Sequence, residues 1–428
     1  MAEVIYRPAR VAGGVQIPPS KSAAHRALLC AALCGAPCTV SPVDASADMH
    51  ATLAGIRALG AGVSFENGVV RVAPGERPAH AVVDCGESGS TLRFLIPVFA
   101  ALGIEAAFIG RGRLPERPIG VYTALLPQHG VQVETVGGLP LKIRGRLQSG
   151  EYRLPGNVSS QFITGLLFAL PRLHGDSEIV LTAPLESKGY IDLTVEVLRG
   201  FGISVRETPR GWLVPGGQAY RAPSYSVEGD WSQAAFFLSA AAVGGGPVAL
   251  RGLRPDSVQG DRACVELWRR FGLEIREKSG VYTAENPRAG EPFRGLRGIR
   301  IDAKQIPDMV PALAVTAAFA AGETVIYNAA RLRIKESDRL AAMEAALSAI
   351  GADVRSTEDG LVVRGRAHLL GGRAEGCNDH RVVMALAAAG CDCTVTVTDA
   401  QSIRKSYPGF FRDFRAIGGK ADGVDMGE

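Results

Sequence analysis

The chain has 428 residues, of which 46% are hydrophobic and 21% charged, so its composition excludes a disordered polymer and its length predicts two domains. The formal net charge of +4 is too small to indicate nucleic-acid binding. No signal-peptide core and no apolar run long enough for a membrane span is present, and the eight cysteines include no CxxC pair. We therefore expect a cytoplasmic protein without nucleic-acid or membrane partners.

The first predicted helix lies within residues 18–33, "PPSKSAAHRALLCAAL", which is alanine- and leucine-rich and therefore buried. Ser20 or Ser22 fits a helix cap, because serine side chains accept from the free amide groups of a first turn. Lys21 does not fit this explanation, since a cation at a helix N-terminus lies at the positive end of the dipole. The motif therefore indicates an anionic ligand at the start of this helix.

A repeat becomes visible beyond this helix. An amphipathic helix that ends in a bulky residue and a glycine, and is followed by an alternating strand, is predicted six times. The glycines, 67 to 79 residues apart, are Gly60, Gly130, Gly202, Gly272, Gly351 and Gly418. Each fits a left-handed helix C-cap, and five of the six strands continue into a hairpin turn.

Apolar helices with polar first residues form a second series that keeps step with the first. They begin near Ser20, Ser88, Ser159, Asp230, Asp308 and Asp379. The two series together predict six copies of one α/β unit. The chain ends before the hairpin of the sixth copy is complete, so we expect the N-terminal segment 2–17 to complete this copy. Three units then form each of two domains, residues 1–19 with 229–428 and residues 20–228.

If the units of a domain pack alike, the N-termini of their apolar helices gather on one face and form an anion site. Capping does not require the polar residues Lys21, Gln161, His380 and Arg381 at these positions. Further charged residues recur at unit boundaries, namely Arg117, Lys335, Glu336, Asp338, Arg339, Arg404 and Lys405. The pattern indicates a ligand with several phosphate or carboxylate groups, with Asp308 and Glu336 as candidate proton-transfer groups.

These motifs resemble those of the 5-enolpyruvylshikimate-3-phosphate synthase family of enolpyruvyl transferases along essentially the whole chain. The matching segments are Ser20–Arg26, Glu87–Arg93, Arg117–Ile119, Val158–Gln161, Ser187–Ile191, "IPDM" with Asp308, Lys335–Arg339, Asp379–Arg381 and Lys405–Pro408. The resemblance implies two domains of three βαβαββ-type units that close over a cleft. It also implies transfer of the carboxyvinyl group of phosphoenolpyruvate to the 5-hydroxyl of shikimate 3-phosphate, in the shikimate pathway, with no metal or organic cofactor.

The resemblance further assigns residues to the two substrates. Shikimate 3-phosphate is expected to contact Lys21, Ser22, Arg26, Ser159, Ser160, Gln161, Ser187, Asp308 and Lys335. Phosphoenolpyruvate is expected to contact Lys21, Gly89, Arg117, Gln161, Arg339, Arg381 and Lys405. Asp308, Glu336 and Lys21 are the catalytic candidates, with Asp308 as the base for the 5-hydroxyl proton; the sequence leaves open which group performs each proton transfer.

The chain departs from the family pattern at three positions. Glu87 stands where many members have asparagine, Ser90 replaces threonine, and Arg331 occupies a position where some members have asparagine. These departures put glyphosate sensitivity in question, and they leave open whether Arg331 contacts the shikimate phosphate.

Three other functions compete with this interpretation. The first is the related transferase that acts on UDP-N-acetylglucosamine, but the loop "GRGRLPERP" lacks the cysteine which that family usually carries there. The second is a non-catalytic protein that only binds anions. The third is a serine hydrolase, for which "GESGS" and "SIRK" lack the partner motifs. We expect a monomer, because the repeats bury their own faces.

Overall fold

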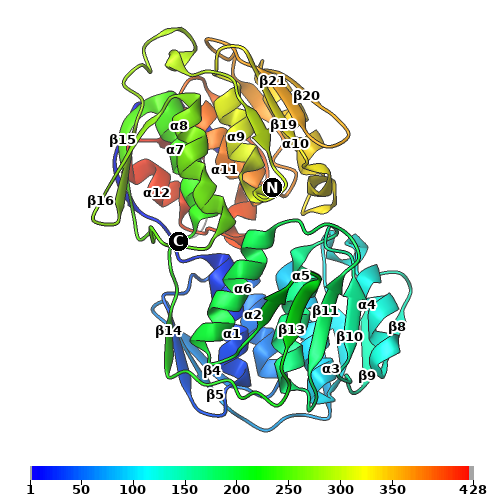
Figure 1. Cartoon of the computed structure of the whole chain (residues 1–428). Coiled ribbons are helices and arrows are strands. Elements are labelled where there is room, and N and C mark those ends of the chain that lie inside the picture. The colour runs from blue at the N-terminus through cyan, green and yellow to red at the C-terminus, as the bar shows by residue number, and fades with distance from the viewer. Residues whose placement is uncertain (1, 424–428) are drawn as a thin grey trace. The chain divides into compact units, whose positions relative to one another are not determined.

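The computed structural model describes residues 2–423, which fall into two compact units (Figure 1). Unit 1 comprises the described residues of Met1–Pro18 and Gly229–Glu428, and unit 2 comprises Pro19–Glu228. Each unit encloses a hydrophobic core of its own. No helix within residues 2–423 is long and apolar enough to cross a membrane.

Residues 2–423 form six four-stranded sheets, three in each unit, and all six have one topology. In each repeat the first strand is parallel to the second, the second is antiparallel to the fourth, and the fourth is antiparallel to the third. In four repeats one helix connects the first two strands, and in all six another helix connects the second and third. This βαβαββ arrangement in six copies confirms the predicted α/β fold class.

The elements follow the order strand, central helix, strand, outer helix, strand, strand in each repeat. In unit 2 they are β14 (Ser224–Ser226), α1 (Lys21–Leu33), β3 (Cys38–Ser41), α2 (Ala47–Ala58), β4 (Gly62–Glu66) and β5 (Val69–Ala73); β6 (His80–Asp84), α3 (Gly89–Leu102), β7 (Glu105–Ile109), α4 (Gly120–Leu125), β8 (Val131–Thr135) and β9 (Leu141–Gly145); and β10 (Glu151–Leu154), α5 (Ser160–Ala169), β11 (Ser177–Leu181), α6 (Lys188–Gly200), β12 (Arg206–Thr208) and β13 (Gly211–Val214).

Unit 1 repeats the same order. Its elements are β2 (Val11–Gln16), α7 (Trp231–Gly244), β15 (Gly245–Arg251), α8 (Cys264–Phe271), β16 (Glu274–Lys278) and β17 (Val281–Glu285); β18 (Arg300–Asp302), α9 (Val310–Ala317), β19 (Glu323–Tyr327), α10 (Arg339–Ala349), β20 (Asp353–Ser356) and β21 (Leu361–Arg364); and β22 (Gly372–Ala374), α11 (His380–Ala389), β23 (Val395–Val397), α12 (Phe410–Ala416), β24 (Lys420–Asp422) and β1 (Val4–Arg7).

The N-terminal segment divides between two repeats, which corrects the expectation that all of 2–17 completes the sixth. β1 does complete it, since Ile5 pairs with Thr396 of β23 and Asp422 of β24. β2 instead lies parallel to β15 and opens the fourth repeat. β14 correspondingly lies parallel to β3 and opens the first repeat. Each crossover of the chain therefore follows the first strand of a repeat.

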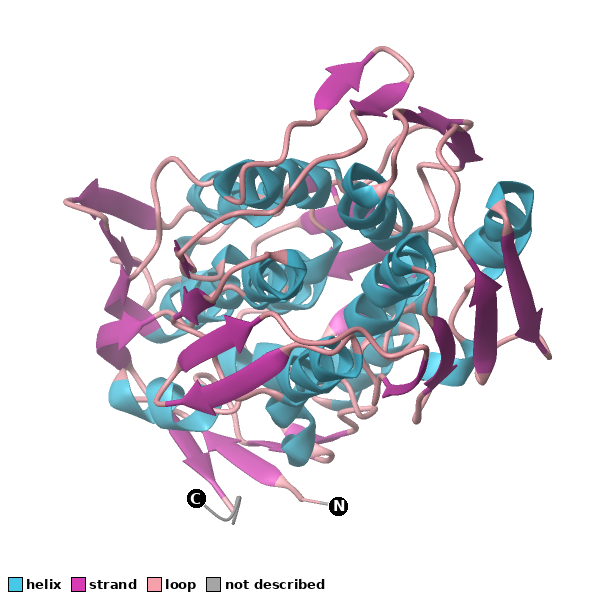
Figure 2. Ribbon diagram, turned by 90° about the horizontal axis from the view of Figure 1, so that it is seen from below, coloured by secondary structure: helices cyan, strands magenta, loops and turns pink. Residues whose placement is uncertain are grey.

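The central helices are buried because their sequences are apolar on every side. Every residue of α7 and of α11 is buried, and eleven of the thirteen residues of α1 are. Strands lie around the outside of the helices in Figure 2, so one sheet face packs on the core. The six glycines of the repeat all have a left-handed φ, between 76 and 120°. The predicted C-cap glycines are thereby confirmed.

Candidate functional site

The N-termini of the three central helices of unit 1 meet around Arg381, as the repeat predicted. Its backbone N–H donates to Asp379, the N-cap of α11, at 2.9 Å. Its guanidinium donates to the carboxylate and the backbone carbonyl of Asp308, in the 3₁₀ turn Pro307–Met309 before α9. It also donates to Ser232, whose hydroxyl donates in turn to Asp230, the N-cap of α7. One arginine thus links three helix N-termini.

Arg339, the first residue of α10, lies beside this junction and is 1% exposed. Its Nε donates to Asp379 at 2.8 Å, and its terminal nitrogens donate to Asp308 at 3.1 Å and to Glu336 at 2.6 Å. Burial opposes the charge of Arg339, but these three carboxylates raise its pKa above the ordinary value. Ser337 also donates to Asp379, so the buried carboxylate is hydrogen-bonded on both oxygens.

Three cations surround the carboxylate of Asp308 and set its electrostatics. Burial would raise the pKa of its carboxyl group, but Arg381, Lys335 and Arg339 together hold that pKa well below the ordinary value. Lys335 lies 3.9 Å from Asp308, and burial lowers the pKa of its ammonium to about 8 against the opposing effect of Asp308. The sequence predicted that five charged residues lie close together, and the structure places them in one cluster: Asp308, Lys335, Glu336, Arg339 and Arg381.

Two further predicted cations lie on segments that border this cluster. Lys405, at the end of the 3₁₀ segment η8 (Ala400–Lys405), is 9% exposed and donates to the carbonyl of Asn378 at 2.8 Å. That carbonyl directly precedes Asp379. Arg331 donates to the carbonyl of Lys304 at 2.6 Å, and its contact with the shikimate phosphate stays a prediction.

The first predicted helix of unit 2 begins as expected, with Ser20 accepting from the N–H of Ala23. Lys21 follows directly and forms an ion pair of 2.7 Å with Asp48 in the first turn of α2. The two side chains are 17% and 15% exposed. Sequence reasoning missed Asp48, because its partner is 27 residues away and "DASADMH" contains no motif that singles it out.

Arg26 and its neighbours pack α1 against α6. The Arg26 guanidinium, 3% exposed, donates to Thr194, to the carbonyl of Ser22 and to the carbonyl of Tyr190. Burial lowers its pKa to about 10. Ser187 precedes α6 in the left-handed region, with φ 56°, and is buried. These contacts hold α1 to the N-terminal part of α6 at Tyr190 and Thr194. Contact of Arg26 with substrate stays a prediction.

The N-termini of α3 and α5 are joined by Gln161. Its amide oxygen accepts from Arg93 at 2.6 Å, and its amide nitrogen donates to Ser90 at 2.9 Å. Ser159 caps α5 by accepting from the N–H of Gln161, and Ser160, 7% exposed, begins the helix. Arg93 was quoted in a motif but received no role from the sequence. The structure shows it orienting Gln161.

Arg117 is the clearest sign of an anion site in unit 2. It is 9% exposed, its Nε is fully buried, and no hydrogen bond or ion pair of its side chain occurs within residues 2–423. Its guanidinium lies on Gly89 at the N-terminus of α3, where a Cβ atom would come within 2.7 Å of it. A buried cation beside the free N–H groups of a helix N-terminus is placed to bind an anion. Glu87 points elsewhere, against Gly112.

The chain is similar to known proteins in sequence and in fold. A sequence model described as EPSP synthase (3-phosphoshikimate 1-carboxyvinyltransferase) matches residues 5–414. Proteins named 3-phosphoshikimate 1-carboxyvinyltransferase from Clostridium kluyveri and Clostridioides difficile are 44% and 41% identical to the chain, each alignment covering 100% of both sequences. A solved structure of EPSP synthase from Acinetobacter baumannii is 26% identical, with a TM-score of 0.80 over 99% of this chain and 100% of that one.

Proposed function

The chain belongs to the EPSP synthase family, and from that membership we propose that it transfers the carboxyvinyl group of phosphoenolpyruvate to the 5-hydroxyl of shikimate 3-phosphate. The reaction releases phosphate by addition and then elimination, through a tetrahedral ketal phosphate. It serves the shikimate pathway of aromatic amino acid biosynthesis.

Arg117 is the observation that most directly supports this proposal. Each substrate carries a phosphate and a carboxylate, and a buried guanidinium with no hydrogen bond or ion pair within residues 2–423 is suited to one of these groups. In the proposal Arg117, Gly89, Gln161 and Lys21 bind phosphoenolpyruvate. The cations proposed to contact the same substrate from unit 1 are Arg339, Arg381 and Lys405.

Shikimate 3-phosphate is proposed to use the polar residues at the starts of α1, α5 and α6. They are Lys21, Ser22, Arg26, Ser159, Ser160, Gln161 and Ser187, together with Asp308 and Lys335 of unit 1. Hydroxyl and amide side chains suit the ring hydroxyls, and the lysines act as compact charges for the phosphate.

We propose that Asp308 becomes a base when substrate binds. With Arg381, Lys335 and Arg339 around it, its pKa is too low for efficient proton abstraction near neutral pH. Anionic substrates compete with Asp308 and Glu336 for these cations, and each cation that binds substrate stabilises the carboxylates less. We therefore propose that substrate binding raises the pKa of Asp308, so the base is activated when the acceptor is present.

Phosphate release tests the function. Purified protein is mixed with both substrates, and each is omitted in turn. Release that requires both, and that is lost in Lys21→Ala and Asp308→Ala, is the expected result. If UDP-N-acetylglucosamine replaces shikimate 3-phosphate as the better acceptor, the proposed substrate is wrong. If a folded protein binds shikimate 3-phosphate without any turnover, the chain is an anion-binding homologue instead.

We also propose that the protein works as a monomer in the cytoplasm. All eight cysteines are free, and seven of them are buried, as expected in a reducing compartment. Each unit closes its sheets over its own core. Sedimentation at micromolar concentration, with the mass of one chain expected and that of a dimer contradicting it, tests the oligomeric state.

A further inference from the structure

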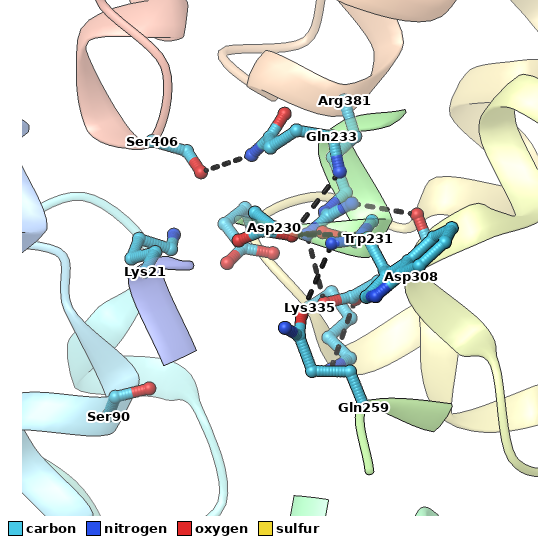
Figure 3. Close-up of polar contacts among 12 residues, drawn as sticks. Lys21, Ser90, Asp230, Trp231, Gln233, Gln259, Asp308, Lys335, Arg381 and Ser406 are labelled. Atoms are coloured by element: carbon cyan, nitrogen blue, oxygen red, sulfur yellow. Dashed lines mark hydrogen bonds and ion pairs between the residues drawn. The ribbon is translucent and has the colours of Figure 1, made fainter. Parts of the chain in front are cut away.

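Gln233, in the first turn of α7, has no assigned role in the proposed reaction. Its side chain is 1% exposed, and its Nε2 donates to the hydroxyl of Ser406 at 3.0 Å (Figure 3). The two residues are 173 positions apart in the chain. Ser406 is itself 4% exposed and directly follows Lys405. The contact therefore connects the start of α7 to the segment that carries Lys405.

The backbone around Lys405 ends a 3₁₀ segment. The N–H groups of Ser406 and Tyr407 both donate to the carbonyl of Ile403, at 3.0 and 2.8 Å. These bonds shape the turn locally, and the ring of Tyr407 contacts Phe237 of α7, but neither provides a polar link between Ser406 and the start of α7. Gln233 supplies such a link, because its own N–H is held by the N-cap Asp230 at 3.3 Å. The glutamine thus extends from a capped helix start to the turn after Lys405.

The other end of the Gln233 amide indicates that stability alone does not account for this residue. Its Oε1 is fully buried and has no hydrogen-bond partner within the part of the chain that the structure describes. Leaving a buried carbonyl oxygen unpaired destabilises a fold, and an apolar side chain of similar size would avoid that cost. A position that keeps such a group is a candidate for a functional constraint.

We propose that Gln233 is a positioning residue for Lys405, acting through Ser406. This inference rests on the proposed function, in which Lys405 binds phosphoenolpyruvate. The amide holds Ser406, Ser406 fixes the end of the 3₁₀ segment, and the Lys405 side chain then projects from a rigid backbone. Without the amide, the ammonium group of Lys405 samples more positions, and binding the anion orders it at an added entropic cost.

Kinetics separate this role from a structural one. In Gln233→Met, the KM for phosphoenolpyruvate rises about threefold to tenfold, as expected for the loss of one neutral hydrogen bond. The Kd of shikimate 3-phosphate stays within twofold of the wild-type value, since Lys405 does not bind that substrate in the proposal. Ser406→Ala raises the same KM, and the double variant is no worse than either single one, because both changes break one link.

Gln259 provides a matched control. It is a second buried glutamine, 7% exposed, directly before the 3₁₀ segment Gly260–Ala263, and its side-chain amide accepts from the N–H of Trp231 and donates to the carbonyl of Gly229 (Figure 3). Gln259→Met therefore lowers stability without a selective rise in the KM for phosphoenolpyruvate. In a Lys405→Ala background, Gln233→Met produces no further rise.

A second readout does not depend on turnover. Hydrogen–deuterium exchange over residues 400–408 accelerates in Gln233→Met and Ser406→Ala but not in Gln259→Met. Unchanged exchange in both Gln233→Met and Ser406→Ala would show that the positioning role is wrong. An active wild type with an unchanged KM for phosphoenolpyruvate in Gln233→Met would show the same. If exchange accelerates as expected while the wild type shows no turnover with the two substrates, the link is real and the proposed function is what fails.

Discussion

The buried charge cluster of unit 1 makes a quantitative prediction about stability. Arg339→Met removes a guanidinium that contacts Asp379, Asp308 and Glu336, while keeping an unbranched side chain. Asp379 is fully buried and loses its charged partner at 2.8 Å, while it keeps hydrogen bonds from Ser337 and from the backbone N–H of Arg381. Removing one member of such a buried pair costs about 3 to 5 kcal/mol, because the remaining charge is uncompensated.

Urea unfolding followed by circular dichroism measures this loss. With a slope of about 3 kcal/mol per molar urea, the midpoint of Arg339→Met falls by about 1 M or more. The matched control is Arg276→Met, whose ion pair with Glu274 is 79% and 50% exposed and whose loss costs about 1 kcal/mol or less. A loss below about 1 kcal/mol in Arg339→Met would refute the claim that the cluster is held together by this arginine.

The pH dependence of that difference follows from the lowered pKa of Asp308. A carboxyl group whose folded-state pKa lies below its unfolded value stabilises the fold above the unfolded pKa, and this contribution is lost as pH falls. The stability difference between the wild type and Arg339→Met therefore keeps its full size from pH 7 down to about pH 4, near the ordinary pKa of an aspartate, and narrows below that pH. A difference that widens on acidification would contradict this assignment.

Three further predictions concern the proposed substrates and the packing of α1. The pKa of Lys335 is about 8, so binding of shikimate 3-phosphate takes up a proton near pH 8, and the Kd increases when the pH is higher than 8. Calorimetry in buffers of different ionisation enthalpy measures this proton uptake, which is absent if Lys335 is not a ligand. Gly89→Ala places a Cβ 2.7 Å from the Arg117 guanidinium. Steady-state kinetics should then show a KM for phosphoenolpyruvate about tenfold higher, with an unchanged Kd for shikimate 3-phosphate. An equal rise in the KM and the Kd would contradict a local effect. Arg26→Met removes three hydrogen bonds, including the one to Thr194, and lowers the free energy of unfolding by about 2 to 4 kcal/mol. Urea titration measures this loss, and an unchanged unfolding midpoint would exclude a role of Arg26 in packing α1 against α6.

Much of the fold was predictable because the repeat is specified by residues that lie close together in the sequence. A glycine with left-handed φ after each amphipathic helix, and a polar cap before each apolar one, depend on residues a few positions apart. The hairpin turn at Asn67–Gly68, where both residues have positive φ, is another such signal. The place of β1 in the sixth sheet also followed, since one strand was missing from an otherwise regular pattern.

The placement of β2 and β14 could not be predicted in the same way. Both are short connecting strands, and their partners β15 and β3 lie about two hundred residues away in the chain. Nothing local distinguishes a strand that closes one repeat from one that opens another. The register is set by pairing with a distant neighbour, which sequence periodicity does not report.

The candidate site shows the same division. The residues that motifs supplied, such as Asp308 and Arg339, do cluster in unit 1. The residues that orient them were missed: Asp48 beside Lys21, Arg93 beside Gln161, and the Gln233 contact with Ser406. These partners hydrogen-bond side chains that are 27 to 173 positions away.

In the proposed reaction the carboxyvinyl group moves from phosphoenolpyruvate to the 5-hydroxyl of shikimate 3-phosphate. The most direct measurement incubates the protein with 13C-labelled phosphoenolpyruvate and this acceptor and follows the labelled carbons by NMR. We expect a vinyl ether at the 5-oxygen that appears together with free phosphate, and no vinyl ether with UDP-N-acetylglucosamine as acceptor. Labelled phosphoenolpyruvate that stays unchanged with shikimate 3-phosphate, in a protein shown to be folded, would contradict it.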